Sequence, residues 1–312
     1  MKCKVIVNPS SGMKNFQRSA IMAMHKLSSE GVLTGAYLQY TTEKYDAYKI
    51  ALDIKPGEYD FVMVVGGDGT ANEVINGIIK GGSKTPICIL PAGTMNDFAT
   101  YLGLPRDTAG LCRMIKSFNV VPCDVGKVND DEYFLNVTAG GTLSEVAHKV
   151  SIEAKTALGR FAYYLEGAKD FTTYKFKSFP IRVEYDDKKI EEDVFLFIIS
   201  NSPNVGGFSG LLPKAKINDG LLDVILIKKP DFVDILPLMM QIRMNTHIQH
   251  PKVKYFQTKS LTISCMDDSI SIPYDYDGEL GGKLPFRAEI VPNAINILVP
   301  DHKLKNLQRT ES

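Results

Sequence analysis

The chain has 312 residues, 44% of them hydrophobic and 23% charged, as in an ordinary globular protein. Its 36 Lys and Arg residues balance 36 Asp and Glu residues, so the formal net charge is zero. A neutral chain lacks the basic excess with which most nucleic-acid-binding proteins neutralise phosphates, and we predict no nucleic-acid partner. The length favours two domains, because single hydrophobic cores seldom grow beyond ~250–300 residues.

The first 120 residues alternate between strand-like and helix-like patterns, which predicts a doubly wound, Rossmann-like α/β domain with a mostly parallel sheet. The expected strands are Lys4–Asn8, Gly35–Tyr40, Phe61–Val65 and Pro86–Leu90, and the expected helices are Phe16–Glu30, Tyr45–Leu52, Ala71–Lys80 and Asp97–Tyr101. Ligands of such sheets bind at the carboxyl ends of the strands.

From about Val121 the chain changes to short β-like runs separated by turn residues, which predicts an antiparallel β-sandwich as second domain. The expected strands are Val125–Val128, Tyr133–Ala139, Ile181–Tyr185, Asp193–Ser200, Leu222–Lys228, Ser260–Cys265, Ser269–Pro273, Leu284–Ile290 and Ala294–Val299, with helical interruptions at Leu143–Phe171 and Phe232–Met244. We predict a first domain of residues 1–122 completed by 294–312, and a second of 123–293. The polar tail Lys303–Ser312 is expected to fray.

The compartment is predicted from the cysteines and from the apolar runs. The five cysteines lie far apart without a CxxC pair, which favours a reducing compartment; they are Cys3, Cys88, Cys112, Cys123 and Cys265. The segment Met1–Pro9 is typical of a strand rather than a signal peptide, and no apolar run approaches the ~20 residues that span a bilayer. We therefore expect a cytoplasmic protein whose membrane contact is peripheral.

A glycine-rich segment, Gly66–Thr70, lies between an apolar strand and a helical pattern. Glycines let the backbone turn sharply and approach a ligand closely, and the amides that begin the helix favour an anion. Asp68 would repel phosphate groups unless a divalent cation lies between them. The segment thus predicts a site for nucleotide phosphate and magnesium, with a ligand-free tight turn as the alternative.

Two more polar loops, Asn8–Gly12 and Pro91–Thr94, follow neighbouring strands of the predicted sheet. All three loops are expected to converge on one edge, which weakens the ligand-free alternative. The chain contains neither GxxxxGKS/T nor GxGxxG, so the Walker-type and dinucleotide fingerprints are excluded.

Four segments, in this order, resemble the diacylglycerol kinase catalytic domain family, which includes soluble bacterial diacylglycerol kinases and sphingosine kinases. They are Asn8–Gly12, Gly66–Glu73, Pro91–Ala99 and Asp277–Glu279. The Gly-Gly-Asp-Gly-Thr core alone is shared with NAD kinases and phosphofructokinases, whereas the ordered set is more specific. Ala71 departs from the family, which more often has leucine there.

The resemblance implies an ATP site built from the amino-terminal loops. The implied residues are Asn8, Pro9, Ser10, Ser11, Gly12, Thr41, Gly66, Gly67, Asp68, Gly69, Thr70, Asn72 and Thr94. Asp68, assisted by Asp97, would orient the catalytic magnesium. For Asp97 the alternative is a cap at the start of the helix that follows.

The resemblance also implies a general base, Glu279, which would take the proton from the lipid hydroxyl. Asp277 would orient the site, and Asp275 receives no role. The alternative for this segment is an exposed Asp-Gly hairpin turn.

A structural magnesium is implied at the Asp219 carboxylate and the carbonyls of Lys216 and Leu221, with Asp124 linking it to the catalytic region through water. Oxygen ligands of this kind suit magnesium. The alternative is an Asp-Gly turn that enters a strand.

Two segments, His148–Lys177 and Phe232–Met244, are candidates for lipid contact, although helices of this composition more often face a core. At ~0.8 kcal/mol per methylene, pulling two acyl chains of roughly thirty methylenes into water would cost about 25 kcal/mol. A lipid kinase must therefore work at the bilayer or shield the chains.

We predict an enzyme that uses ATP and Mg²⁺ to phosphorylate the free hydroxyl of diacylglycerol to phosphatidic acid, at the inner membrane face. Two alternatives stay open: a kinase for a sphingoid base or other long-chain alcohol, and a nucleotide-sensing regulator without turnover. NAD kinase is disfavoured by the Asp277–Glu279 and Asp219 segments. The assembly stays open between a monomer and a homodimer.

Overall fold

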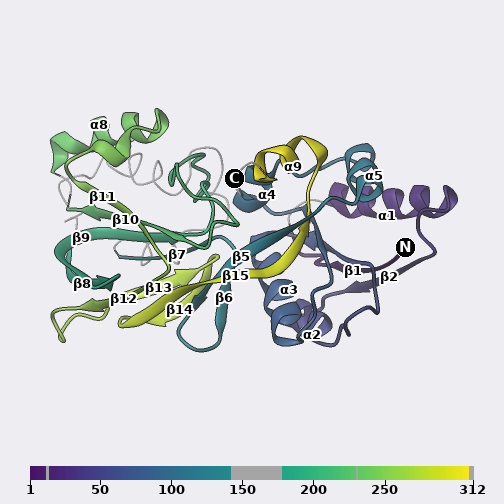
Figure 1. Cartoon of the computed structure of the whole chain (residues 1–312), viewed down its shortest axis with the longest axis horizontal. Coiled ribbons are helices and arrows are strands. Elements are labelled where there is room, and N and C mark those ends of the chain that lie inside the picture. The colour runs from purple at the N-terminus through teal and green to yellow at the C-terminus, as the bar shows by residue number, and fades with distance from the viewer. Residues whose placement is uncertain (12–13, 142–177, 230, 309–312) are drawn as a thin grey trace. The chain divides into compact units, whose positions relative to one another are not determined.

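The computed structural model describes residues 1–11, 14–141, 178–229 and 231–308 (Figure 1). The chain forms two compact units, one of residues 1–125 and 291–312 and the other of residues 126–290. We call them the amino-terminal unit and the β-rich unit. The expected helix Leu143–Phe171 and the candidate lipid segment His148–Lys177 lie outside the described residues.

The amino-terminal unit is built on a parallel sheet with strand order β2-β1-β3-β4. These strands are β1 (Lys2–Val7), β2 (Gly35–Tyr40), β3 (Phe61–Gly66) and β4 (Ile87–Pro91), and the end of β15 (Phe286–Leu298) joins β4 in parallel at Ile297 and Ile87. Every residue of β3 and β4 is buried, as expected for central parallel strands that carry helices on both faces.

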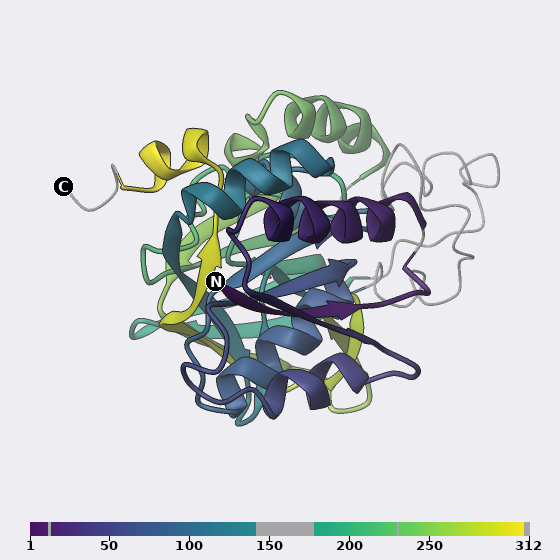
Figure 2. The ribbon, with the colours of Figure 1, turned by 90° about the vertical axis from the view of Figure 1, so that its right-hand side faces the viewer.

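Helices cover the two faces of this sheet (Figure 2). Helices α1 (Lys14–Ser29) and α5 (Thr108–Ser117) pack together on one face, and α2 (Asp46–Leu52) and α3 (Asp68–Lys80) pack on the other. A short helix, α4 (Asp97–Leu102), follows β4. The doubly wound α/β arrangement predicted from the sequence is confirmed.

Helix α9 (Asp301–Gln308) corrects the prediction that the tail frays from Lys303. The Nζ atom of Lys303 donates a hydrogen bond to the carbonyl of Tyr101 at 2.7 Å and lies 3.7 Å from the centre of its ring. Burial in this contact lowers the pKa of Lys303. Leu307 is buried as well, so a polar segment is held by a few specific contacts.

The β-rich unit is an antiparallel sandwich, as predicted. Its strands are β6 (Glu132–Phe134), β7 (Val137–Gly141), β8 (Phe179–Tyr185), β9 (Lys188–Ser200), β10 (Leu222–Lys228), β11 (Val253–Thr258), β12 (Ser260–Cys265), β13 (Pro273–Tyr276) and β14 (Glu279–Lys283). Strands pair in the order β14-β13-β7-β9-β8-β12-β15, β10 pairs with β9 and β11, and β6 pairs with β5 (Val120–Val128).

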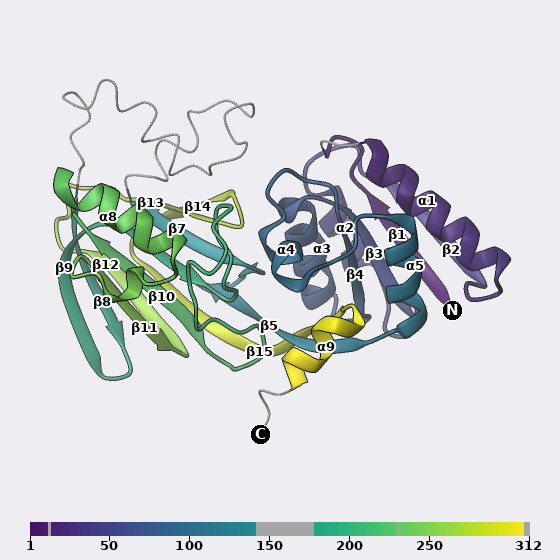
Figure 3. The same cartoon turned by 90° about the horizontal axis from the view of Figure 1, so that it is seen from above.

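Strand β9 is buried on both faces at its end, and this divides the core in two. Phe197 and Ile199 belong to the larger cluster, whereas Phe195 and Ile198 belong to the smaller one. Helix α8 (Phe232–Arg243) closes the smaller cluster with Leu238 and Ile242, and it lies over β10 and β11 (Figures 1 and 3). The 3₁₀ turn η3 (His247–Gln249) follows it.

Four expected elements of the β-rich part differ from the structure. Tyr133–Ala139 is two strands, β6 and β7, and the two predictions Leu284–Ile290 and Ala294–Val299 are one strand, β15. The expected strand Ser269–Pro273 is wrong, because Asp267 closes a local turn through the amide and hydroxyl of Ser269 and pairing begins only at Pro273.

Candidate functional site

The three polar loops of the amino-terminal unit meet at the carboxyl edge of its sheet. The Nδ2 atom of Asn8, just after β1, donates a hydrogen bond to Oγ1 of Thr70 at 2.9 Å. The amide of Ala92, after β4, donates to the carbonyl of Gly66 at 2.7 Å. Asn8 also accepts from the amide of Ser10 at 2.9 Å, which folds the first loop back on itself.

Glycines allow this convergence. A Cβ atom on Gly93 would lie 2.6 Å from the Cα atom of Gly67, and one on Gly66 would lie 2.5 Å from the Cβ atom of Thr70. Real Cβ atoms do not approach other carbons this closely, so glycine is needed at position 93, where the third loop meets the second, and at position 66, where the second loop turns back on Thr70. The side chain of Asn96 braces the third loop, since its Oδ1 atom accepts from the amide of Gly93 at 3.0 Å.

Helix α3 begins at this edge without a side-chain cap. Its N-cap residue is Gly67, which offers no capping group, and the next residues of the helix are Asp68, Gly69 and Thr70. The first amides of a helix carry a partial positive charge and favour an anion. An uncapped start on a thirteen-residue helix therefore fits the phosphate groups of a nucleotide.

Asp68 and Asp97 each stand in the first turn of a helix at this edge, Asp68 in α3 and Asp97 in α4. The cap position before α4 is taken by Asn96 in the left-handed conformation, with φ of 49°, so the alternative cap role of Asp97 is wrong. Asp97 is buried and Asp68 is partly exposed. The sequence analysis gave Asn96 no role, although asparagine is a common turn residue that tolerates the left-handed conformation.

The remaining predicted nucleotide residues lie on the same loops or beside them. Thr41 is buried at the end of β2, where its amide donates to the carbonyl of Val7 at 2.9 Å. Thr94 is exposed on the third loop, and Pro9 is exposed on the first. Asn72 is buried in α3, where its side chain accepts from Asn76. Gly12 lies outside the described residues.

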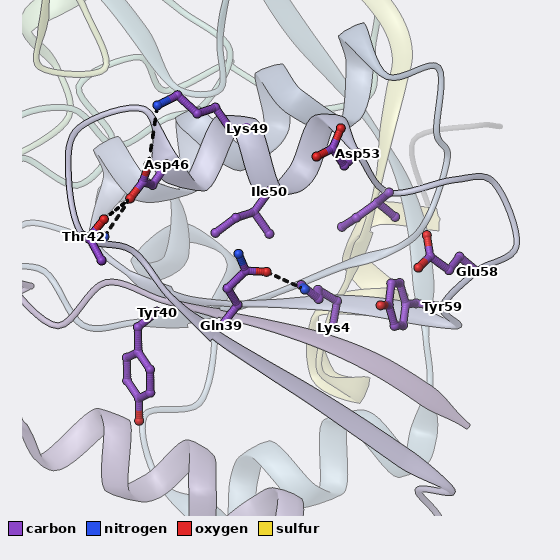
Figure 4. A pocket seen from close by; sticks show the side chains of 11 residues that line it. Lys4, Gln39, Tyr40, Thr42, Asp46, Lys49, Ile50, Asp53, Glu58 and Tyr59 are labelled. Carbon is purple, nitrogen blue, oxygen red and sulfur yellow. Dashed lines mark hydrogen bonds and ion pairs between the residues drawn. The ribbon is translucent and has the colours of Figure 1, made fainter.

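A pocket of about 530 Å³ lies beside β2 and α2, and none of the predicted site residues lines it (Figure 4). Several of its polar side chains interact with one another. Lys4 donates to Gln39 at 2.6 Å, and Lys49 lies 3.6 Å from Asp46. Hydrogen bonds from Thr42 lower the pKa of Asp46 to about 2, and the dashed contacts in Figure 4 show this cluster.

In the β-rich unit, Asp277 and Gly278 form the two-residue turn between β13 and β14. Both have positive φ, 47° and 86°, and Tyr276 pairs directly with Glu279 across the hairpin. This is the geometry of a type I′ turn, for which Asp-Gly is a preferred sequence. The alternative of a hairpin turn is correct in shape but wrong in exposure, since only 9% of Asp277 is exposed.

The buried carboxylate of Asp277 holds a corner of the chain between β6 and β7. It accepts hydrogen bonds from the amides of Leu135, Asn136 and Val137 at 2.6, 3.0 and 2.9 Å. Glu279, two residues later, is the first residue of β14 and is partly exposed.

A buried polar network supports the same corner, and sequence reasoning missed it. The carbonyl of Asn136 accepts from the amide of Asn201 at 2.9 Å and from Oγ of Ser200 at 2.7 Å, while Nδ2 of Asn136 donates to the carbonyl of Asn204 at 3.0 Å. The signal that could have revealed it is the polar run Ser200–Asn204 after an apolar strand, because buried polar groups need partners.

The candidate metal ligands are divided between the units. Asp219 lies in a turn of the β-rich unit, where its Oδ1 atom accepts from the amide of Leu221 at 3.1 Å. Asp124 is buried in the amino-terminal unit and accepts from the amide of Asn293 at 2.7 Å. Among the described residues, no three His, Cys, Asp or Glu side chains gather as a metal site. One carboxylate with the carbonyls of Lys216 and Leu221 still fits magnesium by its oxygen donors.

Another buried carboxylate, Asp223, lies four residues after Asp219, in β10. The hydroxyl of Tyr255 donates to one of its oxygens, and Nε2 of Gln257 donates to the other at 3.2 Å. Burial raises the pKa of Asp223 to about 6. These bonds join β10 to β11, so we read Asp223 as a structural group that sequence reasoning overlooked.

Two family models together match most of the chain. Residues 2–128 match the family model of the diacylglycerol kinase catalytic domain, and residues 137–299 match that of the YegS C-terminal NAD kinase beta sandwich-like domain. The chain is 35% identical over 300 residues to a diacylglycerol kinase of Staphylococcus epidermidis, covering 96% of this chain and 92% of the relative. It is 35% identical over 301 residues to that of Staphylococcus saprophyticus, covering 96% of both chains.

The chain belongs to the diacylglycerol kinase family. A solved structure of a proposed diacylglycerol kinase from Bacillus anthracis has a TM-score of 0.81 and 27% identity, and the match covers 96% of this chain and 97% of that one. Membership identifies a kinase of lipid metabolism. None of the helices in the described part of the chain combines the length and apolar character needed to cross a membrane.

Proposed function

We propose that this chain transfers the γ-phosphoryl group of ATP to the free hydroxyl of diacylglycerol in a magnesium-dependent reaction that yields phosphatidic acid. The observation that carries the proposal is the convergence of three loops on the uncapped start of α3, with Asp68 in its first turn. The relatives named diacylglycerol kinase support the acceptor. Phosphoryl transfer needs mainly positioning and neutralisation of charge, which such an edge can supply.

We assign the nucleotide to the amino-terminal unit, predicted as residues 1–122 with 294–312. The loop amides and hydroxyls would hold the phosphates, with Thr41 and Thr94 beside them. Asp68 would orient the magnesium, assisted by Asp97, and the ion would neutralise charge on the phosphates. Asp68 needs such a cation as a neighbour, since an acid at an anion site is otherwise repelled.

We assign the lipid to the β-rich unit, predicted as residues 123–293. Glu279 would accept the proton of the acceptor hydroxyl, a step worth roughly 10²–10⁴-fold in rate. A second magnesium, bound by Asp219 and the carbonyls of Lys216 and Leu221, would stabilise the turn before β10, and Asp124 would complete its link to the catalytic region.

We also propose peripheral contact with the inner face of the membrane, from a cytoplasmic position. Helix α8 supports this, because its Val233 and Met240 and the residue that ends it, Met244, are 75%, 59% and 69% exposed, whereas Leu238 and Ile242 pack inward. Sedimentation with phosphatidylglycerol vesicles tests the contact, and Met240→Asp should weaken it. Size-exclusion chromatography with light scattering decides between a monomer and a homodimer.

The decisive experiment is a lipid panel with labelled ATP and magnesium in mixed micelles. Wild-type protein should phosphorylate diacylglycerol, Asp68→Ala should lose activity together with metal-dependent ATP binding, and Glu279→Gln should lose turnover while ATP binding survives. Asp267→Asn, an exposed carboxylate in a local turn of the β-rich unit, serves as the control. If a sphingoid base is the best acceptor, the substrate is that lipid and not diacylglycerol. ATP binding without turnover on any lipid would favour a nucleotide-sensing regulator.

A further inference from the structure

Asp277 stands where a carboxylate can set the position of Glu279. One residue, Gly278, separates the two, and the turn conformation of both Asp277 and Gly278 is fixed by their positive φ. The next residue, Glu279, is already paired with Tyr276 in the hairpin. Because the connection has no slack, the place of Asp277 determines the place of the backbone that carries Glu279.

The contacts of Asp277 reach a distant part of the chain. Its carboxylate accepts from three consecutive amides, those of Leu135, Asn136 and Val137, and its own amide donates to the carbonyl of Val137 at 2.8 Å. Hydrogen bonds to a charged acceptor are stronger than those between neutral groups, and burial strengthens them further. The turn is thus tied by four hydrogen bonds to one corner.

That corner is itself held from behind. Nδ2 of Asn201 donates to the carbonyl of Leu135 at 3.3 Å, and Oγ of Ser202 donates to the side-chain oxygen of Asn136. The side chains of Asn136, Asn201 and Ser202 are all buried. The three amides therefore form a prearranged cup for one carboxylate rather than a flexible loop that adapts to it.

The hairpin has one further tie. Oγ1 of Thr138 donates to the carbonyl of Asp275 at 2.7 Å, beside the register pairs that join β13 to β7. This bond orients the strand before the turn, whereas Asp277 orients the turn itself. Both contacts join the hairpin to the segment of residues 135–138. Strand β14, which carries Glu279, pairs with β13 in the sheet and is therefore held through it.

We propose that Asp277 is a positioning residue, which docks its carboxylate into the amide cup of residues 135–137 and thereby holds Glu279 in place for proton removal. The inference rests on the proposed role of Glu279 as base. A displacement of about 1 Å at a catalytic group can cost ~10²-fold in rate, so the anchor matters beyond its share in stability.

The test compares Asp277→Asn with wild type. An amide offers one oxygen and one NH₂ group, so at least one of the three amides would face another donor. We expect kcat with diacylglycerol to fall about 100-fold while KM for ATP stays within threefold, because the nucleotide loops belong to the other unit. Adding Asp277→Asn to Glu279→Gln should lower kcat less than threefold further, since both changes disable the same group.

Two controls separate positioning from loss of stability. Val183→Ala truncates a fully buried side chain in β8 of the same unit and serves as a variant with a comparable loss of melting temperature. Hydrogen exchange followed by mass spectrometry should show faster exchange at residues 135–137 in Asp277→Asn and not in Val183→Ala.

The outcomes are distinguishable. Any of three results would contradict the positioning role: a kcat of Asp277→Asn within threefold of wild type, an equal loss of kcat in Val183→Ala, or unchanged exchange at residues 135–137. Wild-type protein that phosphorylates no lipid, or Glu279→Gln with full turnover, would instead defeat the proposed function; in that case Asp277 positions no base, whatever the exchange shows.

Discussion

Gly93→Ala is the sharpest test of the loop edge as a nucleotide site. The added Cβ atom would lie 2.6 Å from the Cα atom of Gly67 and 3.0 Å from Oδ1 of Asn96. Two carbons pack at about 3.6 Å, so the loops must separate by about 1 Å. Because the obstacle is backbone, neither a rotamer change nor a small side-chain shift relieves it, and we expect a loss of about 1–3 kcal/mol in stability.

The same displacement should weaken catalysis by ~10²-fold in kcat/KM for ATP, since the loops would no longer present their amides at one point. Thermal melting measures the stability loss, and titration calorimetry with ATP and magnesium measures binding. Gly35→Ala is the matched control, because its Cβ atom would meet only the far end of the Tyr37 ring at 3.2 Å. If Gly93→Ala lowers the melting temperature yet binds ATP and turns over like wild type, the edge does not hold the nucleotide.

Three shorter predictions concern other groups. Burial lowers the pKa of His247 below its ordinary 6.5, so on acidification the unfolded state takes up the proton first. The free energy of unfolding should therefore be unaffected by His247 above pH 6.5 and should fall as the pH drops from there towards the folded pKa. Urea titrations of His247→Gln should lack this loss. Burial raises the pKa of Cys3 to about 12, so a maleimide should label the partly exposed Cys265 in the native protein and leave Cys3 unlabelled until unfolding. Asp219→Asn should abolish one magnesium-binding event in calorimetry that Asp267→Asn retains; an unchanged isotherm would count against the metal site.

Much of the amino-terminal unit could be predicted because its strands and helices follow from patterns within short segments of the chain. Buried parallel strands have continuous apolar sequences, and the expected strand Phe61–Val65 lies within β3. Helix α5 was missed, since Gly110 lowers helix propensity within it. Its start is secured by Asp107, which caps the amide of Gly110 at 2.9 Å, and the glycine is needed because a Cβ there would lie 2.6 Å from that of Pro105.

The β-rich unit was harder to predict because distant residues decide its local structure. Tyr133–Ala139 has the apolar pattern of one strand, but Asp277 takes up the amides of its middle residues and splits it. At Asn293 the reverse occurs. The Pro-Asn pair at 292–293 suggests a break between two strands, and Asn293 has a φ of 50°, yet β15 continues through it and its amide donates to Asp124. No local pattern contains these long-range partners.

The candidate site shows the same division. The resemblance suggested Asp277 and Glu279 through a short motif, but the amide cup that holds Asp277 consists of ordinary residues without a motif. In the amino-terminal unit two loops approach closely because Gly67 and Gly93 have no side chains. In the β-rich unit the turn is held by the side chain of Asp277. Loss of function at Gly93 should therefore grow with the volume of the new side chain, from Ala to Val. At Asp277 the loss of function should follow the number of acceptor oxygens lost. Asp277→Ala should therefore lose more activity than Asp277→Asn, although neither new side chain is larger than that of Asp.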